Sequence, residues 1–160
     1  MAKFSHIDAE GRPSMVNVQE KTASLRVASA QSIVELPDEV INGLADLNKP
    51  ETKKGDLFQT AVLAGIMAAK KTGDLIPLCH PIGLDHCDIQ LEFRDDKQLV
   101  ITCTASVFAK TGVEMEAMVG ASIAALTVYD MCKALSHDIV IRETRLMSKT
   151  GGKRDFKRTS

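Results

Sequence analysis

The chain has 160 residues, of which 44% are hydrophobic and 26% are charged, and its formal net charge at pH 7 is −1. This length fits one compact domain, and the near-neutral charge excludes a global field that would steer nucleic acid, so any anion site has to be local. The N-terminus lacks the apolar core of a signal peptide, and the longest apolar run is shorter than the roughly 20 residues of a membrane span. We therefore expect a single domain over 1–160 in the reducing cytoplasm, with free thiols and no nucleic acid or membrane partner.

The first half of the chain predicts an arm, a strand and two helices. Residues 1–20 mix glycine, proline and short polar groups, which indicates an extended N-terminal arm. Apolar residues that alternate with polar or small ones predict a strand over 22–35, and Pro37 ends it. Apolar residues at helical spacing after this proline predict a short helix to about residue 47. Asp56 is the expected N-cap of a second helix that finishes at Lys70 and Lys71.

The second half predicts an antiparallel hairpin, a long helix and a last strand. A turn with two prolines over 74–83 precedes alternating segments that start at Cys87 and end at Val107. A helix over 113–135 and a strand over 138–147 follow, and residues 149–160 form a basic, flexible tail. This order predicts an α+β fold, the ferredoxin-like split βαβ arrangement with a four-stranded antiparallel sheet and its helices on one face.

The long helix carries charges at both ends of an apolar rod. No side of it suits water, so we expect it to be buried all round, with its small residues allowing another backbone to approach: Ala117, Gly120, Ala121, Ala124 and Ala125. The bare face of the sheet and this helix together predict a homo-oligomer. Asp130 and Lys133 are one turn apart, and a desolvated pair with shifted pKa values suits proton transfer, although a plain buried salt bridge is the alternative.

The two ends of this helix cannot serve one ligand within one subunit. Glu116 and Asp130 are 14 residues apart in the sequence, which is ~21 Å along a helix axis. A shared site has to cross a subunit boundary, or each end helps a different copy of the site. For Glu114 and Glu116, stabilisation of the first helical turn is the competing explanation.

Basic residues next to glycine occur in three loops, 53–55, 110–112 and 149–154. Two of these loops precede helix N-termini, where free backbone N–H groups beside a lysine bind phosphate or carboxylate. The three loops together favour a polyanionic small molecule, whereas a solvated loop is the alternative for any one of them.

A zinc site is suggested by a C-H-x5-H-C string that comprises Cys79, His80, His86 and Cys87. The spacing does not suit structural zinc, so we expect no metal and buried thiols instead. His80 is different because the rigid turn with Pro77 and Pro81 can aim its imidazole into a pocket, although backbone hydrogen bonds could equally satisfy it. The chain has no P-loop, dinucleotide-binding or zincin motif.

Five strings stand out along the chain: KKGD at 53–56, AGIMAAKKTGDLIPLCHP at 64–81, KTGVEMEAM at 110–118, ALTVYDMCKA at 125–134 and RLMSKTGGK at 145–153. Together they resemble a known family, the cyclic pyranopterin monophosphate synthases, which are the accessory C proteins of molybdenum cofactor (molybdopterin) biosynthesis. The resemblance implies a ferredoxin-like hexamer built as a trimer of dimers, with its active site at a subunit interface. It implies a phosphorus–oxygen lyase without a cofactor that converts 3′,8-cyclized dihydroguanosine triphosphate to the cyclic monophosphate of a pyranopterin and releases diphosphate.

The resemblance also implies roles for individual residues. Asp130, Lys133 and Lys54 would be catalytic. The substrate would be bound by residues of the second, third and last strings: Leu78, Cys79, His80, Glu114, Met115, Glu116 and Lys149. Two departures from the family pattern, Asn17 in the arm and KTGGKRD at 149–155, weaken the implications for the arm and the tail only.

Two other classes of function remain open from the residues. A non-catalytic nucleotide-sensing module would bind a similar ligand at a subunit interface without turnover. A zinc or redox protein would use Cys79 and Cys87 and would contain bound metal.

Overall fold

The computed structural model describes residues 4–44, 46 and 49–159, which form a mainly antiparallel sheet with helices on one face. The elements in chain order are β1 (Ser24–Glu35), α1 (Asp38–Gly43), β2 (Glu51–Thr52), β3 (Gly55–Asp56), α2 (Leu57–Ala69), α3 (Thr72–Leu75), β4 (His86–Phe93), β5 (Gln98–Ala109), α4 (Glu114–Cys132), β6 (Val140–Thr150) and β7 (Phe156–Lys157). The predicted α+β class is therefore confirmed.

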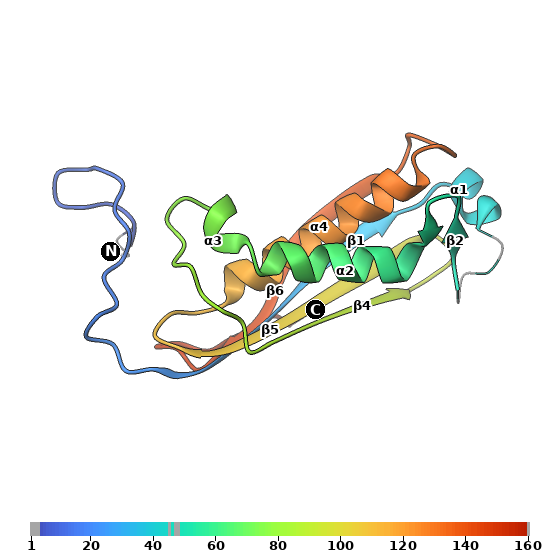
Figure 1. The fold of residues 1–160 in the computed structure, drawn as a ribbon. Coiled ribbons are helices and arrows are strands. Elements are labelled where there is room, and N and C mark those ends of the chain that lie inside the picture. Colours follow the sequence, from blue (N-terminus) through green and yellow to red (C-terminus); the bar gives the residue numbers. More distant parts are fainter. Residues whose placement is uncertain (1–3, 45, 47–48, 160) are drawn as a thin grey trace.

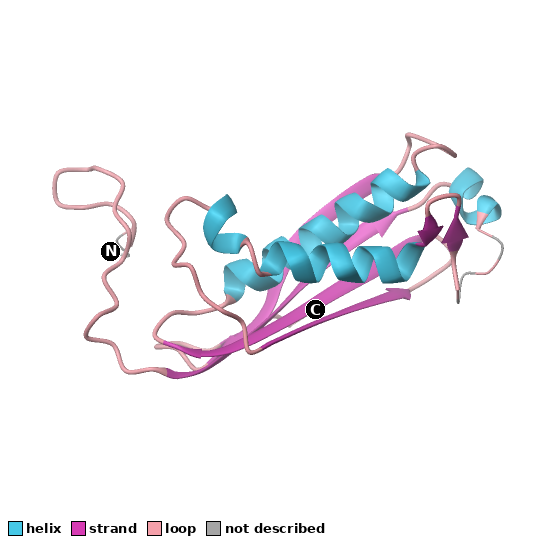
Figure 2. Cartoon of the chain, viewed as in Figure 1, coloured by secondary structure: helices cyan, strands magenta, loops and turns pink. Residues whose placement is uncertain are grey.

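The main sheet has the strand order β4-β5-β1-β6-β7, and β2 pairs with β3 in a separate hairpin. The prediction of four strands is wrong, because the chain after β6 turns back and adds the short strand β7. The central strand β1 pairs antiparallel with β5 on one side and with β6 on the other, so that Ala30 lies opposite both Cys103 and Leu146. Helices α2 and α4 form one layer across the sheet, and the N-terminal arm extends away from this body (Figures 1 and 2). Alternate residues of the strands point under the helices, which explains the period-two pattern of the sequence.

Glycine residues allow α2 and α4 to pack closely together. A Cβ atom built on Gly65 would lie 2.8 Å from the carbonyl oxygen of Gly120, and one built on Gly120 would lie 2.7 Å from Sγ of Cys103 in β5. The small residues of α4 are fully buried against α2 and the sheet of the same chain. The sequence correctly predicted that these residues permit a close approach, but the backbone that approaches within this chain is that of α2.

The prediction that α4 is buried all round is wrong for the single chain. The sheet and α2 cover only part of its circumference, and its outer side leaves Leu126 52% exposed and Met115 37% exposed. This helix is long and apolar enough to cross a membrane by length and composition, but half of its apolar window is buried in the protein core. Its apolar character is therefore that of a core helix with one open side.

Several predicted boundaries also change. Helix α1 ends at Gly43 because Leu44 has extended dihedral angles, whereas the sequence predicted a helix to about residue 47; residues 45, 47 and 48 lie outside the described residues. The turn over 74–83 begins within a short helix, α3, that the sequence did not predict. Strand β6 continues to Thr150, and β7 pairs with it inside the segment that was predicted to be a tail.

We predict that Gly65→Ala destabilises the protein. Alanine favours a helix by up to about 1 kcal/mol over glycine, but its methyl group would press on the backbone of α4, and such overpacking costs about 1–3 kcal/mol. The expected net loss in the free energy of unfolding is about 1–2 kcal/mol, measured by urea denaturation.

Gly83→Ala is the matched control, because no atom lies within 4 Å of its added Cβ and its φ is not positive. Its free energy of unfolding should change by less than about 0.5 kcal/mol. Equal stability of the Gly65→Ala variant and the parent protein would contradict the close packing of the two helices.

Candidate functional site

At the C-terminal end of α4, one carboxylate contacts two ammonium groups. Asp130 accepts a hydrogen bond from Nζ of Lys54 at 2.7 Å on one oxygen and forms an ion pair with Nζ of Lys133 at 2.8 Å on the other. Lys54 also donates to the backbone carbonyl of Asp130 at 3.0 Å. We call these three residues the acid–lysine cluster, and their two positive charges and one negative charge leave a net charge of +1.

The β2–β3 hairpin places Lys54 in this cluster. The turn is closed by Thr52, whose hydroxyl accepts a hydrogen bond from the backbone N–H of Lys54 at 3.0 Å, and by Gly55, whose φ of +112° favours glycine. Asp56 then caps α2 by accepting from the backbone N–H of Gln59 at 2.9 Å, which confirms the predicted N-cap. The KKGD string therefore forms a turn that is anchored to the start of a core helix.

The acid–lysine cluster is solvated, so the predicted desolvation of the Asp130–Lys133 pair is wrong for the single chain. The side chain of Asp130 is 53% exposed because it lies on the open side of α4. The predicted pairing itself is confirmed, and hydrogen bonds from Lys133 and then Lys54 lower the pKa of Asp130 to about 2. The same bond raises the pKa of Lys133, so at neutral pH Asp130 is an anion that holds protonated lysine in place.

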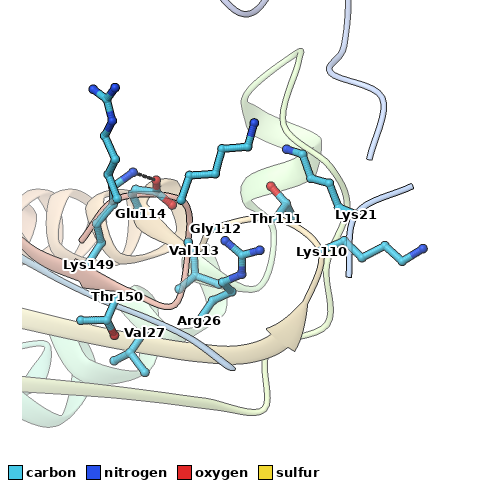
Figure 3. Close-up of a pocket in the computed structure, with 13 residues that line it drawn as sticks. Lys21, Arg26, Val27, Lys110, Thr111, Gly112, Val113, Glu114, Lys149 and Thr150 are labelled. Carbon is cyan, nitrogen blue, oxygen red and sulfur yellow. Dashed lines mark hydrogen bonds and ion pairs between the residues drawn. The ribbon is translucent and has the colours of Figure 1, made fainter. Parts of the chain in front are cut away.

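A cavity of about 500 Å³ lies at the other end of α4, beside its N-terminus (Figure 3). Six cationic side chains and a single carboxylate, Glu114, line it, and we call it the basic cavity. The cations are Lys21, Arg26, Lys110, Lys149, Lys153 and Arg154. Such an excess of positive charge around backbone N–H groups suits a polyanion.

Glu114 and Lys149 form an ion pair within the basic cavity, with Nζ 2.8 Å from Oε1 (Figure 3). Burial raises the pKa of Glu114, but the hydrogen bond from Lys149 and the nearby charge of Arg26 outweigh it, so the pKa lies below its ordinary value. Glu114 is therefore ionised at neutral pH, and an incoming anion would compete with it for Lys149.

A second cavity of about 280 Å³ shares Lys21, Thr111, Gly112 and Glu114 with the first, and we call it the histidine cavity. It brings together most of the predicted substrate residues: Leu78, Cys79, His80, Glu114, Met115 and Glu116. Nε2 of His80 lies 2.7 Å from the carbonyl oxygen of Val16 in the arm. Because a carbonyl only accepts, Nε2 carries the proton, and His80 both meets a backbone partner and lines a cavity.

Glu116 is the buried acid of the histidine cavity, with only 3% of its surface exposed. Burial, followed by the nearby charge of Glu114, raises its pKa to about 7. Burial, with the charges of the same two glutamates, also raises the pKa of the neighbouring Cys79 thiol. Glu116 can therefore gain or lose a proton near neutral pH, whereas Glu114 cannot.

The predicted site residues thus fall into two groups at opposite ends of α4. The loops over 110–112 and 149–154 meet in the basic cavity, but the loop over 53–55 belongs to the acid–lysine cluster. Glu116 and Asp130 are 14 residues apart along the helix, which corresponds to ~21 Å, as the sequence predicted. No ligand of ordinary size touches both groups in one chain.

The zinc-like string is also divided between cavities. Cys79 and His80 line the histidine cavity, whereas His86 and Cys87 line a separate cavity beside α2. Within the described part of the chain, no three His, Cys, Asp or Glu side chains gather in a group that could hold a metal ion.

Sequence reasoning missed Lys21 and Arg26 of the basic cavity. Arg26 occupies a polar position of a strand, where nothing local distinguishes it from a solvent-facing residue. Only the register of the sheet, which sets Val27 opposite Thr150, brings Arg26 and the last basic loop together.

We predict that Glu116 makes stability fall as the pH rises. Its folded-state pKa of about 7 lies above its ordinary value of 4.5, so between these values the folded chain binds a proton that the unfolded chain has released. The free energy of unfolding should decline through this window and level off above it. Glu116→Gln should remove this decline, so its stability relative to the parent protein should rise with pH in denaturation curves.

Glu114→Gln is the matched control, with the opposite sign. Because the folded-state pKa of Glu114 is depressed, its contribution is present above its ordinary pKa and is lost as the pH falls through the lower folded value. This variant should be less stable than the parent protein at neutral pH, with the difference shrinking in acid. Parallel curves for Glu116→Gln and the parent protein would contradict the raised pKa of Glu116.

Comparison with known proteins identifies the family. The model of the MoaC family matches residues 15–152. Cyclic pyranopterin monophosphate synthase of Xanthomonas oryzae pv. oryzae is 49% identical over 155 residues, which cover 97% of this chain and 93% of that protein. The synthase of Brevibacillus brevis is 47% identical over 157 residues, covering 98% and 96%. Molybdenum cofactor biosynthesis protein 1 of Dictyostelium discoideum is 46% identical over 94% of this chain, which matches only 26% of that longer protein. This chain therefore belongs to the MoaC family.

Proposed function

We propose that this chain is a cyclic pyranopterin monophosphate synthase of molybdenum cofactor biosynthesis. It acts as a lyase that converts (8S)-3′,8-cyclo-7,8-dihydroguanosine 5′-triphosphate to cyclic pyranopterin monophosphate and releases diphosphate. The observation that carries the proposal is the pair of adjoining cavities at the start of α4, where a strongly cationic space lies beside one of mixed polar and apolar lining that contains His80 and Glu116. A triphosphate fits the first space, and the polar edge of a purine-derived ring fits the second.

The charges of the basic cavity suit the phosphate chemistry. Closing the cyclic phosphate forms a bond from a sugar hydroxyl to the α-phosphorus and breaks the bond to diphosphate, which leaves with the electron pair. Cations around the leaving group stabilise the charge that develops on it. Lys149, which donates to Glu114, and Arg26 both line this cavity, which supports a role for them in binding these oxygens.

The remaining steps move protons, and the histidine cavity and the acid–lysine cluster supply different groups for them. Ring opening by water and closure of the pyran need an acid and a base near the purine-derived ring. Glu116, with a pKa of about 7, suits a proton carrier in the histidine cavity. Lys133 and Lys54 suit charge stabilisation and proton donation, while Asp130 fixes their positions.

We propose further that the complete site is shared between subunits of a homo-oligomer, a hexamer built as a trimer of dimers. The separation along α4 between the acid–lysine cluster and the two cavities supports a shared site. Exposed apolar side chains on the helical layer support association, and they include Leu63, Met67 and Leu126. The face of the sheet opposite α2 and α4 carries no helix in the described part of the chain, which leaves a second surface for contact (Figure 2).

We also propose that the fold is ferredoxin-like and that the protein is cytoplasmic. The order of the four long strands, β4-β5-β1-β6, with one main helix before β4 and one before β6, supports a ferredoxin-like arrangement. Four free cysteines support a reducing cytoplasmic location.

We predict that Asp130→Asn and Lys133→Ala each lower the release of diphosphate from the cyclized triphosphate by about 10²–10⁴-fold. Both side chains are solvated in the single chain, so the circular dichroism of the folded protein should be unchanged. The oligomeric mass is measured alongside, so that a loss of chemistry is distinguished from a loss of assembly. Asp38→Asn removes another exposed ion pair, that with Lys97 at 3.0 Å, and should keep full activity. Near-normal activity of either site variant would contradict the assignment, and saturable binding without diphosphate in the parent protein would favour a nucleotide sensor.

We also predict that two inactive variants restore each other's activity when they assemble together. Asp130→Asn disables the acid–lysine cluster, and Lys149→Ala disables the basic cavity. If each site takes one cluster from each of two subunits, random mixing leaves about a quarter of the sites intact. Mixed oligomers, made by co-refolding and assayed for diphosphate, should recover about that share of the parent activity. No recovery in verified mixed oligomers would contradict a shared site without affecting the identity of the reaction.

A further inference from the structure

Two thiols outside the proposed active site lie side by side in neighbouring strands. Cys87 of β4 is opposite Ala105, and Cys103 of β5 is opposite Ile89, so the two cysteines are diagonal neighbours on the same face of the sheet. Their sulfur atoms are 3.8 Å apart. The residues of a diagonal pair are within reach of one another's side chains, and these two sulfurs are already in contact.

The two thiols differ in access to solvent. Cys103 is completely buried, and its sulfur lies directly beneath Gly120 in the middle of α4. Cys87 is partly exposed and lines an open cavity of about 420 Å³ together with Lys70 and His86. A small solute can therefore reach Cys87, whereas Cys103 is shielded from solvent.

The local electrostatics also separate Cys87 from the other thiols. The hydrogen bond from Cys103 lowers the pKa of Cys87, although burial and the charge of Asp88 oppose this effect. That same bond, together with burial, raises the pKa of Cys103. Burial raises the pKa of Cys79 and raises that of Cys132 to about 11. Cys87 is consequently the thiol most readily converted to a nucleophilic thiolate.

We infer that Cys87 and Cys103 are a redox pair, in which Cys87 reacts with a hydroperoxide and Cys103 resolves the product to a reversible intrachain disulfide. In the first step, written for hydrogen peroxide, Cys87 loses its proton and its thiolate attacks one peroxide oxygen. An S–O bond forms, the O–O bond breaks, and the hydroxide that leaves takes up that proton and departs as water. In the second step Cys103 loses its proton and attacks the sulfur of Cys87, an S–S bond forms, the S–O bond breaks and a second water leaves. Two thiols are oxidised by two electrons in total, and the peroxide is reduced to water.

The position of β4 allows this bond to close. The sulfurs have to approach from 3.8 Å to about 2.05 Å, and a diagonal pair needs some movement of the backbone. Among the described strands, β4 lies at the edge of the main sheet and pairs only with β5, so it can shift without breaking a second ladder.

The experiment treats the folded full-length protein with hydrogen peroxide, denatures it, alkylates the free thiols with iodoacetamide and maps the peptides by mass spectrometry. Cys87 and Cys103 should escape alkylation together and appear as one linked peptide pair, while Cys79 and Cys132 remain alkylated. Dithiothreitol added before alkylation should restore both thiols. Undiminished alkylation of Cys87 and Cys103, or a disulfide to Cys79 or between chains, would overturn the inference.

Variants separate the roles of the two thiols. In Cys103→Ser the linked peptide should disappear, and dimedone should capture a sulfenic acid on Cys87. Cys132→Ser is the matched control and should form the linked pair to the same extent as the parent protein. Protein that is denatured before the peroxide treatment should lose the preference for this pair, and an equal preference there would overturn the geometric basis of the proposal.

Discussion

The straight length of α4 is the constraint on which the candidate site depends. The helix is fixed to α2 at the crossing of Gly65 and Gly120 and to the sheet beneath it, so it cannot bend to bring its ends together. Glu116 at one end and Asp130 at the other therefore keep their separation whatever ligand binds. A ligand that needs both groups has to meet the ends of two different copies of α4, which is the physical reason for proposing a site shared between subunits.

The ends of α4 also differ in what their carboxylates can do. Asp130, held by two lysines, has a pKa near 2 and stays charged under physiological conditions. Glu116, which is buried and lies near the charge of Glu114, has a pKa near 7. The sequence assigned proton transfer to the Asp130–Lys133 pair, but in the free chain the fixed charges lie there and the exchangeable proton lies on Glu116. Bringing the two ends together combines a rigid charged group with a titrating acid in one site.

Local signals in the sequence predicted much of this arrangement. The cap at Asp56, the alternating strands and the one-turn spacing of Asp130 and Lys133 each depend on near neighbours, and all three are confirmed. The exposure of Asp130 was not predictable from its apolar neighbours, because burial depends on which sides of α4 the rest of the chain covers. The presence of Lys21 and Arg26 in the basic cavity was not predictable for a related reason. The register of the sheet and the path of the arm bring them there.

The distribution of small and large residues on α4 limits how a second copy can bind. The glycine and alanine residues of α4 are buried in contacts within the chain, so they cannot also pack closely against the backbone of a second copy. The open side of the helical layer instead presents larger apolar side chains, among them Leu126 of α4 and Met67 of α2. Because the acid–lysine cluster lies on this same open side, a partner that covers Leu126 would also remove water from around Asp130. The desolvation that the sequence suggested and the single chain lacks would then be supplied by assembly.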